Sequence, residues 1–141
     1  MTGSEVSDRI GFRGSELEQL PNNRCRTRVV VAWSTGDEFV GAAQGDDTEA
    51  GRLKCAVDAT ARALEKSVSD EITLDVEGVR ILKESDTTLI VVLISYRLLG
   101  GTQQKLVGSC IIGKQPLRSA ALAVLKATNR IMGNVAPLQS G

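Results

Sequence analysis

The stretch that most constrains this chain runs from Thr88 to Tyr96, with the sequence TLIVVLISY. It is the longest apolar run and is rich in β-branched residues, which predicts a single β-strand. Both faces of that strand are apolar, one formed by Leu89, Val91 and Leu93 and the other by Ile90, Val92 and Ile94. A strand with two apolar faces needs cover on both sides. Helices of the same chain can cover one face, and we expect a second copy of the chain to cover the other.

The turn and periodicity signals predict five strands and two helices between residues 28 and 133. We expect strands over 28–34, 38–44, 72–82, 88–96 and 105–112, and helices over 46–67 and from Pro116 to Gly133. This ββα-βββα order predicts an α+β two-layer sandwich, in which two helices cover one face of an antiparallel-rich sheet. Residues 1–27 are polar and lack periodicity, so we expect a flexible N-terminal tail, and residues 134–141 predict a short C-terminal tail.

Two segments of the chain repeat each other. Phe39–Ala43 resembles Leu106–Cys110, and each segment is followed by a helix rich in alanine. The matched helix positions are Leu53, Ala56, Ala59 and Ala63 in the first copy and Leu117, Ala120, Ala123 and Ala127 in the second. Two units of strand, glycine and helix indicate an internal duplication with pseudo-twofold symmetry.

The region from about Arg28 to Met132 resembles the C-terminal regulatory domain of 2-isopropylmalate synthases and related citramalate synthases. The residues that carry the resemblance are Gly41 and Gly45 before the first helix, Gly108 in the last strand, and the stretch Ala120–Arg130. The resemblance implies a stand-alone form of a duplicated domain that dimerises and binds a feedback inhibitor at the dimer interface. The loops Gly45–Glu49 and Gly113–Pro116 depart from the family's pattern, so the fold and the dimer carry over further than the identity of the ligand.

The loops before the two helices are the candidate ligand site. Helix N-termini expose unpaired amides that favour a carboxylate or phosphate. Asp46 and Asp47 place negative charge at the first helix, where Asp46 and Glu49 also form a capping-box-like pair, and Lys114 places positive charge at the second. We therefore predict a small amino-acid-like or carboxylate ligand, bound near the dimer interface. Its predicted contacts are Gly41, Gly45, Asp46, Asp47, Gly108, Gly113 and Lys114.

Residue counts exclude several kinds of chemistry. The chain has no His and three widely spaced Cys, so we expect no enzyme activity, no metal and no cofactor. Zero net charge and 3% aromatic residues argue against nucleic-acid binding. Sparse thiols fit a cytoplasmic protein, and no membrane span or signal peptide is indicated. Cys25 lies between Arg24 and Arg26, which predicts a reactive thiol if it is exposed.

The function predicted from the sequence is a non-enzymatic ligand-binding or regulatory module that acts as a homodimer. Val92, Ile94 and Tyr96 on the apolar strand are the predicted interface residues. Two alternatives stay open: a small RNA-binding α+β domain with a basic tail, and a roadblock- or profilin-like scaffold for protein interactions. The N-terminal tail could also tether a protein partner.

Overall fold

The computed structural model describes residues 10–68, 72–98 and 100–132, and these form two successive units of three strands and one helix. Residues 1–9 of the predicted N-terminal tail lie outside the described residues. So do Gly133 and the whole predicted C-terminal tail, residues 134–141. The elements are β1 (Ile10–Leu20), β2 (Arg24–Trp33), β3 (Glu38–Asp46), α1 (Glu49–Lys66), β4 (Ile72–Glu84), β5 (Thr87–Leu98), β6 (Gln103–Ile111) and α2 (Pro116–Met132).

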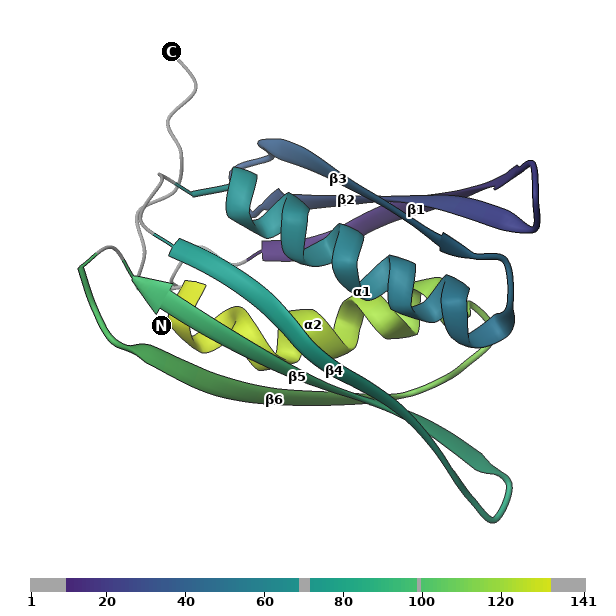
Figure 1. The fold of residues 1–141 in the computed structure, drawn as a ribbon. Coiled ribbons are helices and arrows are strands. Elements are labelled where there is room, and N and C mark those ends of the chain that lie inside the picture. The colour runs from purple at the N-terminus through teal and green to yellow at the C-terminus, as the bar shows by residue number, and fades with distance from the viewer. Residues whose placement is uncertain (1–9, 69–71, 99, 133–141) are drawn as a thin grey trace.

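The strands form two separate antiparallel sheets rather than one continuous sheet. The first sheet has the order β1-β2-β3 and the second the order β4-β5-β6. Each sheet and the helix that follows it make a two-layer unit, and the two units pack with their helices between the sheets (Figure 1). The predicted α+β sandwich with internal duplication is therefore confirmed, with each sheet covered by helices on one face only.

The glycine of each repeat lies directly beneath its own helix. A Cβ built on Gly41 would overlap the backbone of α1 at Ala59 and Ala63, and one built on Gly108 would overlap α2 at Ala123 and Ala127. These are the helix positions that the sequence repeat had matched, so the duplication extends to the contact between helix and sheet. Glycine is required here because the two backbones approach too closely for any side chain.

The ends of α1 are fixed by side chains other than those predicted. Thr48, rather than Asp46, is the N-cap, and its hydroxyl accepts a 2.9 Å hydrogen bond from the amide of Gly51. At the other end, the buried indole of Trp33 donates to the carbonyl of Ser67, the C-cap residue, at 2.9 Å. Trp33 therefore links β2 to the end of the helix and satisfies one of its terminal carbonyls.

The prediction of a tail over residues 1–27 is wrong from Ile10 onward. Residues 10–20 form β1, which pairs with β2 along its whole length, and β2 itself begins at Arg24. Ile10 is buried in the core and Phe12 packs against it. The first unit is therefore βββα, like the second, and the predicted ββα order missed its first strand.

Candidate functional site

The outer face of the second sheet, the face turned away from the helices, carries a group of apolar side chains. Ile90, Val92 and Ile94 are fully buried toward the helices, so alternation places the other face of β5 outward. The register pairs Leu89 with Leu82 and Ile111, and Leu93 with Val107, whereas Val91 lies between Arg80 and Ser109. We call this set the apolar outer face: Leu82, Leu89, Val91, Leu93, Val107 and Ile111. Val107 and Ile111 are 65% and 62% exposed, and Leu82 is 44% exposed.

The structure reverses the predicted orientation of β5. Val92 and Ile94 were expected at an interface, but both are 0% exposed within the chain's own core. Tyr96 is half-buried and packs against that core, while its hydroxyl lies 3.5 Å from the amide oxygen of Gln104. The second apolar face predicted for β5 is formed by Leu89, Val91 and Leu93, which lie outward.

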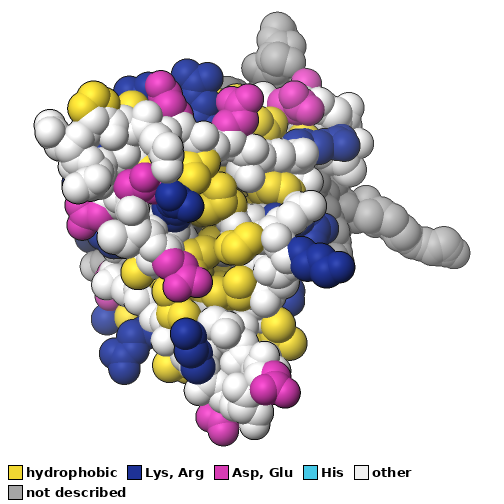
Figure 2. Space-filling model, turned by 90° about the vertical axis from the view of Figure 1, so that its right-hand side faces the viewer, with side chains coloured by type: hydrophobic (Ala, Val, Ile, Leu, Met, Phe, Trp, Pro, Cys, Tyr) yellow, Lys and Arg dark blue, Asp and Glu magenta, His cyan; other side chains and the backbone are white. Residues whose placement is uncertain are grey.

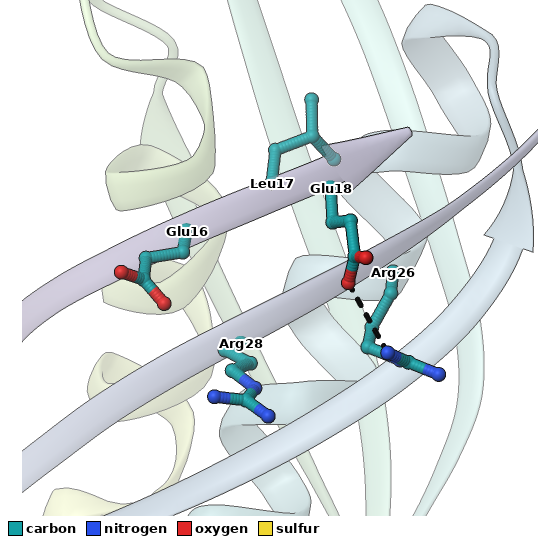
Figure 3. A pocket seen from close by; sticks show the side chains of 5 residues that line it. All are labelled: Glu16, Leu17, Glu18, Arg26 and Arg28. Atoms are coloured by element: carbon teal, nitrogen blue, oxygen red, sulfur yellow. Dashed lines mark hydrogen bonds and ion pairs between the residues drawn. The ribbon is translucent and has the colours of Figure 1, made fainter. Parts of the chain in front are cut away.

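The outer face of the first sheet is more highly charged, although Val30 and Val40 also lie on it. Arg26 and Arg28 point outward from β2, and their cross-strand partners on β1 are Glu18 and Glu16 (Figure 3). Arg26 and Glu18 form a 3.1 Å ion pair, and these four side chains line a shallow hollow together with Leu17. Charged cross-strand pairs of this kind are typical of a sheet face that contacts water.

A second hollow, of about 500 Å³, lies at the end of the molecule where the two helices begin. Figure 2 shows this end, where a band of hydrophobic side chains runs between charged groups. The hollow is lined by residues of β1, the β3–α1 loop, α1 and α2, namely Leu17, Asp47, Thr48, Glu49, Arg52, Leu53, Pro116 and Leu117. The N-termini of both helices therefore lie at this hollow, whereas Gly41 and Gly108 do not line it.

An ion pair occupies the charged side of this hollow. The guanidinium Nε of Arg52 lies 2.5 Å from a carboxylate oxygen of Asp47, and Gln19 donates to the other oxygen at 3.2 Å. The hydrogen bond from Arg52 lowers the pKa of Asp47, and the same contact raises the pKa of Arg52. The backbone amide of Asp47 also donates to the carbonyl of Asn23 at 2.8 Å, which ties the helix start to the β1–β2 turn.

The structure brings only part of the predicted ligand site together. Asp47 lines the hollow, whereas Asp46 points to solvent and pairs with Arg24 at 2.9 Å. Lys114 is exposed and does not line the hollow. The amide of Gly113 donates to the Ser119 hydroxyl at 3.1 Å.

Three predicted ligand contacts are corrected because protein atoms already fill the space beside them. Gly41 and Gly108 are covered by helices, and the space next to Gly45 holds the sulfur of Cys55. Arg52 and the three leucines of the hollow were not predicted from the sequence. The sequence did contain indications of them. Arg52 lies one turn after the start of the first helix, and Leu53 and Leu117 are equivalent positions of the repeat.

Comparison with known proteins gives no family: no protein-family model matches the chain, and no curated protein matches its sequence significantly. Among the described residues, no group of three His, Cys, Asp or Glu side chains is placed to hold a metal ion. No helix in the described part of the chain is long and apolar enough to cross a membrane.

Proposed function

We propose that this protein is a non-enzymatic homodimerisation module that binds a small ligand, and that two copies meet through the apolar outer face. The proposal rests on one observation: equivalent residues that face away from the helices differ in polarity between the two repeats. Gly41 pairs with Val29 and Gly108 with Val92, which aligns Arg28 with Val91 and Arg26 with Leu89. At these two positions the first sheet carries arginine and the second an apolar residue, whereas the equivalent pairs Val30 with Leu93 and Val40 with Val107 are apolar in both sheets.

Packing inside the chain does not account for this difference, because the outer faces contact neither helix. An apolar outer face is favourable only when another surface covers it. Covering the exposed part of a side chain such as Val107 contributes roughly 1 kcal/mol, and a twofold interface counts each residue twice. Charged residues at the rim, such as the Glu77–Lys105 pair at 3.4 Å, fit the polar border of a protein interface.

The repeat supplies a matched pair of variants to test the dimer. Val107 and Val40 are equivalent residues on the last strand of each sheet, and both are exposed, at 65% and 43%. We expect the wild type to show twice the mass of one chain in light scattering at micromolar concentration. Val107→Asp should give monomer, because it places a charge in the interface, and Val40→Asp should stay dimeric. A monomeric wild type, or equal disruption by both variants, would refute the proposed interface.

The ligand part of the proposal concerns the hollow at the helix N-termini. Its walls combine three leucines with the Asp47–Arg52 pair, and the N-termini of both helices lie at it. This combination suits a small carboxylate or amino acid that carries an apolar group, with Arg52 as the counter-ion for its carboxylate. The resemblance to regulatory domains of 2-isopropylmalate synthases supports the same ligand class.

A thermal-shift screen of amino acids and short carboxylic acids tests the ligand separately from the dimer. We expect an active compound to raise the melting temperature of the wild type and not that of Arg52→Gln. The matched control is Arg28→Gln, because Arg28 is an arginine on the outer face of the first sheet, away from the hollow. Stabilisation that survives Arg52→Gln, or no stabilisation by any compound, would remove this site from the proposal.

A further inference from the structure

Two of the three cysteines lie together inside the first unit, although they are 30 positions apart in the chain. Cys25 is the second residue of β2 and Cys55 lies in the second turn of α1. Both are free thiols and both are buried, at 0% and 2% exposure. Cys25 was expected to be reactive only if exposed, and the structure does not meet that condition.

Gly45 explains how the two sulfurs come close. Cys25 and Gly45 are cross-strand partners in the first sheet. A Cβ built on Gly45 would lie 2.6 Å from the Cys55 sulfur, so that sulfur occupies the space where a side chain of residue 45 would stand. Cross-strand neighbours have Cβ positions about 4.5–5.5 Å apart, so the Cys55 sulfur lies beside the Cys25 side chain. Burial and the adjacent Cys25 raise the pKa of Cys55 to about 11.

The second unit shows that cysteines are not needed to fill these positions. The alignment that matches Val29 with Val92 also matches Cys25 with Thr88, and the helix alignment matches Cys55 with Ser119. The same skeleton therefore accepts hydroxyl side chains at both places. Packing alone therefore does not require two thiols at these positions of the first unit.

We propose that Cys25 and Cys55 form a dithiol site that closes to an internal disulfide by exchange with a small-molecule disulfide. In the first step, a protein thiolate attacks the small disulfide, which gives a mixed disulfide and releases one small thiolate. In the second step, the other protein thiolate attacks the protein sulfur and releases the second small thiolate. The two protein thiols lose two electrons, and their protons pass to the two released thiolates.

The position of Cys25 gives the reagent a route to a buried pair. Cys25 follows the turn at residues 21–23, and strand ends next to turns open more readily than the centre of a sheet. Its thiol donates to the carbonyl of Asp46 at 3.4 Å, in the segment that leads into α1. The disulfide would therefore join β2 to α1 next to the segment that leads into the hollow, whether or not that hollow binds a ligand.

The test uses the full chain with Cys110→Ser, which removes the remaining, partly exposed thiol. The protein is incubated with oxidised glutathione at pH 8, blocked with N-ethylmaleimide and digested with trypsin. We expect a linked peptide that joins Cys25–Arg26 to Cys55–Arg62. The melting temperature should rise by about 10 °C, because the link closes a loop of 30 residues in the unfolded chain, and dithiothreitol should reverse the rise.

Two variants give controls that should fold. Cys25→Thr with Cys55→Ser copies the residues of the second unit and should show neither the link nor the rise. Cys55→Ser alone should stop at a glutathione adduct on Cys25. The proposal is overturned if the parent protein gives only glutathione adducts, if the link forms only in denaturant, or if the linked protein melts at or below the temperature of the reduced form.

Discussion

Replacing Gly41 by alanine tests the closest contact in the fold. The added methyl group would lie 2.0 Å from the carbonyl oxygen of Ala59, so α1 must move away by about 1.4 Å to restore ordinary contact. Overpacking of this kind costs roughly 1–3 kcal/mol, and we expect the upper end because backbone atoms cannot rotate aside as a flexible side chain can. Alanine also stiffens the unfolded chain, which offsets about 0.5–1 kcal/mol. The net loss is about 2–2.5 kcal/mol, or roughly 10 °C in melting temperature.

Thermal and urea denaturation followed by circular dichroism measure this loss. Gly108→Ala should behave like Gly41→Ala, because Gly108 lies against the equivalent backbone atoms of α2. Gly11→Ala is the matched control, since this strand glycine has no atom within 4 Å of an added Cβ. We expect the control to stay within about 1 kcal/mol of the wild type. A Gly41→Ala protein that melts within about 2 °C of the wild type would refute the close packing inferred here.

Three further outcomes follow from single contacts. Deletion of residues 1–20 should give an aggregating or unfolded protein in a solubility and circular dichroism assay, because it removes β1 and its buried side chains. Trp33→Phe should lower the free energy of unfolding by about 1–3 kcal/mol in urea, because the carbonyl of Ser67 loses its buried donor. The folded-state pKa of Asp47 is lowered by Arg52, so this carboxylate stabilises the fold above about pH 4 and stops doing so as the pH falls through the folded pKa. Asp47→Asn should therefore reduce the fall in melting temperature between about pH 5 and pH 3, and an unchanged pH profile would contradict that role.

The missed strand β1 shows what periodicity does not reveal. Its inward residues, the buried Ile10 and the half-buried Phe12, are followed by a bulge before Gly14, which shifts the phase of the alternation. Beyond the bulge, residues 16–19 are exposed and include Glu16 and Glu18, so local composition looks like a tail. The duplication carried the missing information, because a second unit with three strands before its helix implies three strands in the first.

The orientation of β5 required knowledge of strand pairing. Both faces of the strand are apolar, so composition alone could not choose between them. The choice follows once Val92 is paired with Gly108, because that glycine lies under α2 and its partner must face the same helix. The positions of Gly41 and Gly108, by contrast, were correctly matched from sequence, since their spacing to the alanines of each helix is local.

The two units differ mainly where the fold leaves them free to differ. Inside, each places a glycine under a pair of helix alanines, and a larger residue at either place would separate helix from sheet. Outside, no such constraint acts, so the outward residues reflect whatever surrounds each sheet. The first sheet carries cross-strand ion pairs such as Arg26–Glu18 beside Val30 and Val40, and the second carries more valines and leucines beside Arg80. Because one chain contains both sheets, the first sheet is a control for the second. A substitution that disrupts association only on the second sheet can then be attributed to its apolar residues.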